Sequence, residues 1–374
     1  MSVYFDGYHY DENFIEKLNL SCDRVNAFDF NSALNKKIKS SSMIKYLSRI
    51  YKDLDYCEIC REQTLLMNLE ECFSMVIDFY SQINPNLGEE VDNILHGKNK
   101  LFDVHCFTNR KDKNFGLNNV GSGGNDTKLT FNVSFGGSLR SLRTLVHECA
   151  HSLNSLITRG VNLRNRISIE SDINKKQDLE REEREFYIKT HQWDYDSIGE
   201  TESLIAEKLF NLYLYNNGII TKEEFNEYLD GEKNSLINNL ILIFEENKIL
   251  TALNENISLE NFNSFEKSIR GTRLYKKLMS RVKTMTERKP RSSEHSLYKF
   301  RYVVGEIIST LWMERFLNTD TETKQKMKDE FVEFLAISYN LNINDACSHL
   351  LHQDITSCAE EYLSIITKNK ELQK

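Results

Sequence analysis

A chain of 374 residues, 40% of them hydrophobic, can bury a substantial core in one two-lobed unit or in two or three domains. Its net charge of −8 gives no general electrostatic basis for binding nucleic acid or an anionic membrane, so we expect neither as a partner. The first residues lack a basic segment followed by an apolar run, and no stretch of about eighteen apolar residues occurs. We therefore predict a cytoplasmic protein without a membrane span, and leave open export by a route that needs no signal peptide.

Apolar residues recur at helical spacing along most of the chain, which only Pro85 and Pro290 interrupt. A mainly α fold class follows from this pattern. The periodicity predicts helices over residues 11–20, 40–82, 201–230, 234–254, 259–285, 297–318 and 323–339.

Residues 101–137 are rich in glycine and break the helical pattern. The run from 128 to 135 alternates between an apolar face with Leu129, Phe131, Val133 and Phe135 and a polar face with Thr130, Asn132 and Ser134. Such alternation predicts a half-buried strand, which we expect to pair with Leu101–Phe107 in a small sheet. Gly136 and Gly137 then break the strand, and Ser138 is suited to cap the helix that follows.

That helix carries the sequence His147-Glu148-Cys149-Ala150-His151. Residues four apart share a helix face, so the two histidines can bind one metal ion. Glu148 lies about 100° round the helix, where it can take a proton from a metal-bound water without being a ligand. The pattern is typical of zinc hydrolases.

A catalytic zinc ion usually has three protein ligands and one position open to water. Glu200, Ser203 and Glu207 share one face of the next predicted helix, so Glu200 is a candidate third ligand. Two alternatives stay open on spacing alone. Ser197 and Glu200 also form a capping-box pattern, in which the glutamate binds a backbone donor, and Glu202 is a competing ligand.

Residues 129–155 run from the alternating strand through a glycine turn into the His-Glu-x-x-His helix. Upstream lie Lys113-Asn-Phe-Gly116 and Gly121-Ser-Gly-Gly124, and downstream lies Gly199–Glu207 with the pattern E-x-x-S-x-x-x-E. In this order the blocks resemble the thimet oligopeptidase and oligoendopeptidase F family of zinc peptidases. The resemblance covers about residues 100–310.

The resemblance implies a two-lobed, mainly helical zincin-like fold with a small β-sheet beside the HExxH helix. It implies one Zn²⁺ held by His147, His151 and Glu200, with Glu207 holding a histidine in orientation. It also implies an extended substrate that adds to the strand at residues 129–134 through its main chain, in contact with Thr130, Asn132 and Ser134.

In the family a late helix supplies a histidine and tyrosines that grip the substrate and the tetrahedral intermediate. The similar segment here is His295–Gly305, in which Tyr298 and Tyr302 lie one helical turn apart. The resemblance implies that these phenols, with His295, donate hydrogen bonds to an oxyanion beside the zinc. The alternative is that Tyr298 and Tyr302 belong to an ordinary core stripe with Ile308.

The chain also departs from the family pattern. Ala150 replaces the glycine before the second histidine, and Asn154 stands where many members have a further histidine. Glu200 follows His151 by 49 residues, a longer gap than usual, and the charged segment Glu170–Arg184 accounts for the excess. We predict that this segment is a solvated helix or loop without a function. Because the chain is shorter than typical members, we expect a reduced N-terminal region.

Together these observations predict a zinc-dependent endopeptidase or oligopeptidase that hydrolyses extended peptides or unfolded proteins, with Glu148 as the general base. We place an N-terminal helical lobe at residues 1–97 and a catalytic region at residues 98–374. Two other functions stay open: a peptide- or protein-binding module on a degenerate peptidase scaffold, and a specialised protease with a single target, such as a delivered effector.

Overall fold

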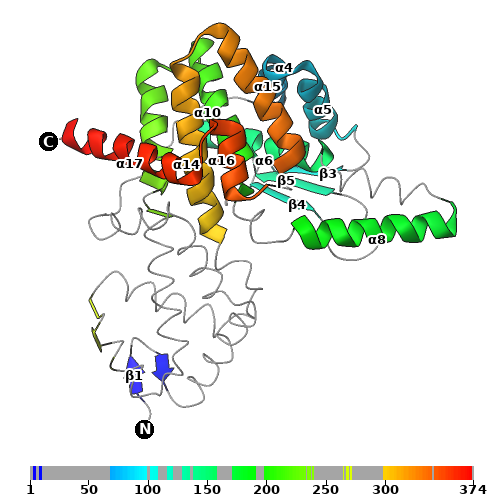
Figure 1. Cartoon of the computed structure of the whole chain (residues 1–374), viewed down its shortest axis with the longest axis horizontal. Coiled ribbons are helices and arrows are strands. Elements are labelled where there is room, and N and C mark those ends of the chain that lie inside the picture. The colour runs from blue at the N-terminus through cyan, green and yellow to red at the C-terminus, as the bar shows by residue number, and fades with distance from the viewer. Residues whose placement is uncertain are drawn as a thin grey trace. The chain divides into compact units, whose positions relative to one another are not determined.

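The computed structural model describes residues 3–5, 8–10, 68–98, 102–107, 116–120, 129–134, 138–157, 171–190, 198–232, 298–338 and 341–372, with a few positions between 234 and 271. The predicted helices over residues 11–20, 234–254 and 259–285 lie wholly or mainly outside these residues, as does the first part of the one over residues 40–82. The described part is mainly helical, as predicted (Figure 1). Among its helices, none combines the length and apolar character that crossing a membrane requires.

The chain forms two units, Met1–Cys57 with Leu236–Val303, and Glu58–Ser235 with Val304–Lys374. In the first unit, β1 (Val3–Phe5) and β2 (Tyr8–Tyr10) pair in antiparallel fashion. The second unit holds the helix with the metal motif. The lobe boundary after residue 97 stays a prediction.

The described part of the second unit begins with two helices joined by one residue. α4 (Leu69–Ile83) starts at a capping box, because Asn68 accepts from the backbone N–H of Glu71 and the Glu71 carboxylate accepts from that of Asn68. Asn84 ends α4, and its side chain caps α5 (Pro85–Leu95). The apolar periodicity did not predict α5, although its first residue, proline, is favoured at that position of a helix.

A three-stranded sheet follows, in the order β3-β5-β4. β5 (Leu129–Ser134) is parallel to β3 (Phe102–Phe107), with Phe102 opposite Leu129, so the predicted pairing is confirmed. On its other side β5 is antiparallel to β4 (Gly116–Val120). The sequence pattern did not predict this strand, because it contains glycine and asparagine, which are uncommon in strands. The side chain of Phe131 in β5 is fully buried, which agrees with the predicted apolar face.

α6 (Leu139–Ile157) carries the metal motif and contacts β4, β5 and helices α4, α5 and α10, so the sheet lies beside it as predicted. It begins as predicted, because Ser138 Oγ accepts from the backbone N–H of Ser141 at 3.1 Å. Leu142, Leu145, Cys149 and Leu153 form a buried apolar stripe along it, and Leu156 at its end is half-buried.

Three buried hydrogen bonds hold α6 against neighbouring helices. The Tyr80 hydroxyl of α4 donates to the carbonyl of Val146 at 2.8 Å. At the other end, Asn154 Nδ2 donates to the Leu335 carbonyl (2.8 Å) of α15 (Thr321–Ile337) and to Ser338 Oγ (2.7 Å). Because a buried donor without an acceptor costs about 1–3 kcal/mol, these partners explain how an asparagine is tolerated at position 154.

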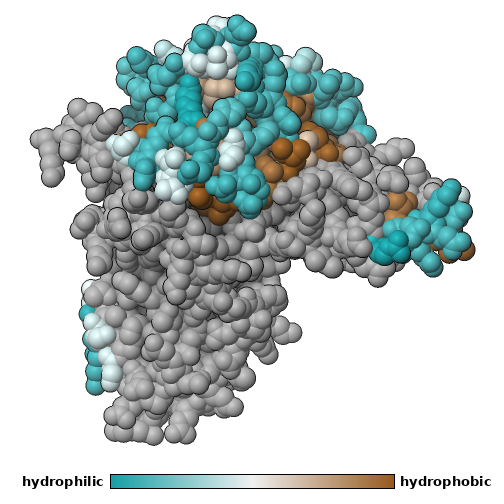
Figure 2. Space-filling view, in the orientation of Figure 1, coloured by the Kyte–Doolittle hydropathy of each residue, from teal (hydrophilic) through white to brown (hydrophobic). Residues whose placement is uncertain are grey.

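The charged segment forms α8 (Ile173–Thr190), a helix rather than a loop. Its first turns are solvent-exposed, and Figure 2 shows mainly hydrophilic side chains on its described part. Ile173 is an exception, with 74% of its surface exposed. The prediction of a solvated element is therefore confirmed for residues 171–178.

α10 (Thr201–Asn216) is buried on nearly all sides. The prediction of one continuous helix over residues 201–230 is wrong in one respect. Gly218, at a φ of 68°, ends the first helix, and a second helix covers residues 222–232. The second helix has its own cap, in which the Thr221 and Glu224 side chains each accept from the other residue's backbone N–H.

The described residues between 298 and 372 form four helices, of which α14 (Tyr298–Leu317) and α15 match predicted segments. α14 carries buried residues around its whole circumference, including Val304, Ile308 and Trp312, which is the pattern of a helix enclosed in a core. α16 (Ile343–Leu351) and α17 (Ile355–Leu372) fall outside the predicted segments.

Candidate metal centre

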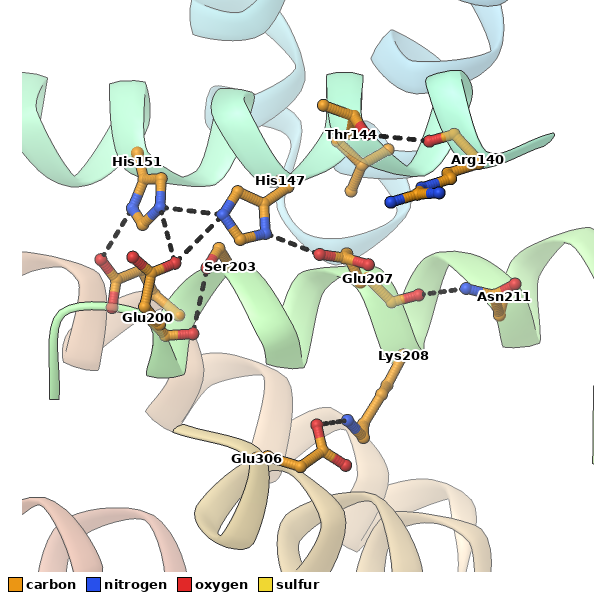
Figure 3. Close-up of polar contacts among 12 residues, drawn as sticks. Arg140, Thr144, His147, His151, Glu200, Ser203, Glu207, Lys208, Asn211 and Glu306 are labelled. Atoms are coloured by element: carbon orange, nitrogen blue, oxygen red, sulfur yellow. Dashed lines mark hydrogen bonds and ion pairs between the residues drawn. The ribbon is translucent and has the colours of Figure 1, made fainter. Parts of the chain in front are cut away.

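Three donor atoms from two helices converge on one point of the second unit (Figure 3). The Nε2 atoms of His147 and His151 are 3.1 Å apart. Glu200 Oε2 lies 3.1 Å from the first and 3.3 Å from the second. A tetrahedral zinc ion with bonds of about 2.0–2.1 Å separates its ligand atoms by about 3.3 Å. The spacing and the His-His-Glu donor set therefore fit a metal ion of this kind.

The fold places these side chains in two different ways. α6 presents the two imidazoles from successive turns, with ring centroids 4.7 Å apart. Glu200 comes from the start of α10, where it is the N-cap residue and makes no side-chain capping bond. The capping-box alternative needed Glu200 inside the first helical turn, so it is wrong for α10. Ser197 lies outside the described residues.

The site is electrostatically matched to a cation. Burial alone would raise the pKa of Glu200, but the adjacent imidazoles of His151 and His147 hold it well below its usual range. For His151, burial lowers the pKa, and the carboxylates of Glu200 and Glu202 outweigh it and raise the pKa to about 9. Burial likewise lowers the pKa of His147, but Glu200 and Glu207 raise it well above the ordinary value. These shifts favour protonated imidazoles beside an ionised Glu200, so a metal ion that binds here would displace protons from the histidines.

A second carboxylate faces each histidine from the side away from the convergence point. Glu207 Oε1 lies 2.6 Å from His147 Nδ1, and Glu202 Oε1 lies 3.3 Å from His151 Nδ1. Each carboxylate can accept the Nδ1 proton of its histidine, and the Nε2 lone pair is then available to a metal ion. Glu202 was a candidate ligand by spacing. It instead occupies the outer side of His151, since Glu200 at the N-cap already fills the inner one.

Replacing Glu207 with alanine is expected to weaken zinc binding by about 10–100-fold, because His147 loses the acceptor that fixes its ring and tautomer. Competition titration against a chromophoric chelator measures the affinity. Glu223→Ala, at an exposed position of the 222–232 helix, is the matched control and should bind zinc as the wild type does. Equal affinities in the two variants would contradict the role assigned to Glu207.

Other predicted site residues are placed less completely. Glu148 lies on α6 between the two histidines, and only 6% of it is exposed. Tyr302 is half-buried on α14. The side chain of Tyr298 and the whole of His295 lie outside the described residues, so their proposed contacts stay predictions.

The predicted strand addition at β5 is wrong. Every residue of β5 from Leu129 to Val133 has a partner in both β3 and β4, so β5 is the central strand and offers no edge to a substrate. The side chains of Thr130, Asn132 and Ser134 lie outside those described, and their contact with a substrate stays a prediction without the main-chain pairing.

No model of a known protein family and no curated protein matches the sequence. Among solved structures, a candidate oligoendopeptidase F from Bacillus anthracis str. Ames is 10% identical with a TM-score of 0.48, over 96% of this chain and 56% of that one. A candidate peptidase from Chlamydophila abortus is 13% identical with a TM-score of 0.47, over 94% and 60%. The chain thus spans less than two thirds of either protein. What the site can do chemically is therefore inferred from its own side chains.

Proposed function

We propose that this chain is a zinc-dependent peptidase that hydrolyses peptide bonds in extended peptides or unfolded proteins. The observation that carries the proposal is that ligand atoms of His147, His151 and Glu200 all lie within 4.8 Å of one another. The helix that presents the two histidines also carries Glu148. Two imidazole nitrogens and one carboxylate oxygen form a common donor set of catalytic zinc, and they leave a coordination position for water.

In this proposal His147, His151 and Glu200 hold the ion, and Glu207 and Glu202 orient the two imidazoles. Zinc, when bound, acts as a Lewis acid and lowers the pKa of a coordinated water to about 7. Glu148 accepts the proton of the attacking water and passes it to the leaving amine. Tyr298 and Tyr302, with His295, are the proposed donors to the developing oxyanion.

A buried glutamate beside the metal histidines favours hydrolysis over simple binding. Glu148 contributes no ligand atom to the convergent group, and only 6% of its surface is exposed. The residue that follows the first histidine of an HExxH motif lies where a carboxylate can serve as the general base for a metal-bound water. A binding module on the same scaffold would not need such a base, so the presence of Glu148 supports hydrolysis.

Chelation is expected to abolish cleavage of a quenched fluorescent peptide library, and stoichiometric Zn²⁺ is expected to restore it, since the attacking water depends on the ion. Elemental analysis of the purified protein should give one zinc per chain. Stoichiometric zinc without cleavage of any library member would contradict the peptidase assignment and favour the binding-module alternative. A mock-treated sample, passed through the same buffers without chelator, is the control.

A further inference from the structure

α14 approaches the third-ligand residue unusually closely at Gly305. A Cβ atom built on Gly305 would lie 3.1 Å from both the carbonyl carbon and the carbonyl oxygen of Glu200, and 3.0 Å from Leu204 Cδ1. Ordinary van der Waals contact begins at about 3.4 Å, so a side chain here would have to move its neighbours. Two of those neighbours are backbone atoms of the residue that supplies the third ligand.

A buried ion pair fixes the register of the same contact. Glu306, next to Gly305, accepts from Lys208 Nζ of α10 at 2.7 Å, and both side chains are at most 4% exposed. The second carboxylate oxygen of Glu306 accepts from Thr310 Oγ1 at 2.7 Å. Figure 3 shows the pair below α10, on the side away from the histidines. Because separating a buried pair is costly, α14 cannot slide along α10 without a large loss of stability.

The position of Glu200 depends on the position of the first turn of α10. Its carbonyl accepts from the backbone N–H of Leu204 (3.1 Å) and from Ser203 Oγ (3.0 Å), both in that turn. The distance from the Glu200 carboxylate to the histidines on α6 therefore depends on where the first turn of α10 lies relative to α6. At this point α14 packs against α10 and limits how far that turn can lie from α6.

We propose that Gly305 is a positioning residue of the metal centre. Its missing side chain lets α14 lie against the Glu200 peptide group, and this contact holds the Glu200 carboxylate at bonding distance from a metal on the two histidines. The Lys208–Glu306 pair keeps Gly305 opposite Glu200. The inference rests on the proposed function only as far as metal binding, and it requires no hydrolysis.

Gly305→Ala is the direct test. We expect on the order of 10-fold weaker Zn²⁺ binding and an altered visible absorption spectrum of bound Co²⁺, because the new methyl group displaces Glu200. Alanine is a better helix former than glycine by about 1 kcal/mol, so loss of helix propensity cannot explain weaker binding. Asn318→Ala, at an exposed position just after the end of α14, is the control and should leave both readouts unchanged.

The Leu204→Ala background separates the two contacts of Gly305. It removes the isopropyl group of Leu204, including Cδ1, and leaves the Glu200 backbone atoms in place. Adding Gly305→Ala in this background should weaken metal binding as in the wild type, and this comparison also serves if the single variant does not fold. Full recovery of zinc affinity and of the Co²⁺ spectrum would overturn the proposal, as would an unchanged affinity in Gly305→Ala. A wild-type protein that binds zinc but cleaves nothing would overturn the peptidase function and leave this test intact.

Discussion

Glu148→Gln is expected to lower kcat by about 10²–10⁴-fold, the usual contribution of a positioned general base, while zinc stays bound at one ion per chain. The amide has nearly the shape of the carboxylate and fits the same buried position on α6, but it cannot accept the proton of the attacking water. Steady-state cleavage of the best library peptide gives kcat, and elemental analysis of the same sample gives the metal content.

The control is Glu223→Gln, the same chemical change at an exposed position of the 222–232 helix, which should leave kcat unchanged. If Glu148→Gln hydrolyses at the wild-type rate with its zinc in place, the assignment of Glu148 as general base is wrong. If the variant loses both metal and activity, the role of Glu148 is in holding the site together, which also contradicts the assignment.

Zinc affinity is expected to fall steeply as the pH is lowered from 9 to 6. The pKa of His151 is raised to about 9 in the metal-free protein, so below that pH a proton competes with the ion for Nε2. The unprotonated fraction falls tenfold for each pH unit below the pKa, which gives a loss of about 10³-fold over this range for a single displaced proton. Competition titrations at several pH values measure the slope, and a flat profile would contradict a proton-loaded site.

The metal-free protein should show the opposite trend in stability. The folded pKa of His151, about 9, lies above its ordinary value of 6.5, so protonation stabilises the folded chain. This contribution is fully present below pH 6.5 and is lost as the pH rises through about 9. Melting temperatures of chelated protein should therefore decrease over this window, whereas those of the zinc-loaded protein, at fixed free zinc, should not follow that decrease.

Local sequence patterns predicted the parts of the site that one element builds alone. The four-residue spacing of His147 and His151 fixes a shared helix face, and the alternation around Phe131 fixes a strand and its buried side. Both depend on periodicities of a single element. The pairing of β5 with β3 also followed, because few other strand-like segments lay nearby in the sequence.

The parts that depend on where an element begins, or on a distant neighbour, were not predictable. The choice between Glu200 and Glu202 turns on α10 starting at Thr201, which places Glu200 at the N-cap. The antiparallel partner of β5 is a short segment containing glycine and asparagine, so strand addition at β5 was expected wrongly. In the sequence, Gly305 cannot be distinguished from an ordinary glycine in a helix, because its close contact is with a residue more than a hundred positions earlier.

The connection that contains α8 has an entropic consequence for the metal centre. It joins the second and third predicted ligands, 49 residues apart in the chain. The entropy of closing a flexible loop grows only with the logarithm of its length, so doubling the connection costs about 0.6 kcal/mol. A segment as long as α8 can therefore be gained or lost between His151 and Glu200 at little cost in free energy. The same arrangement of ligands in space is thus compatible with very different numbers of residues between them in the chain.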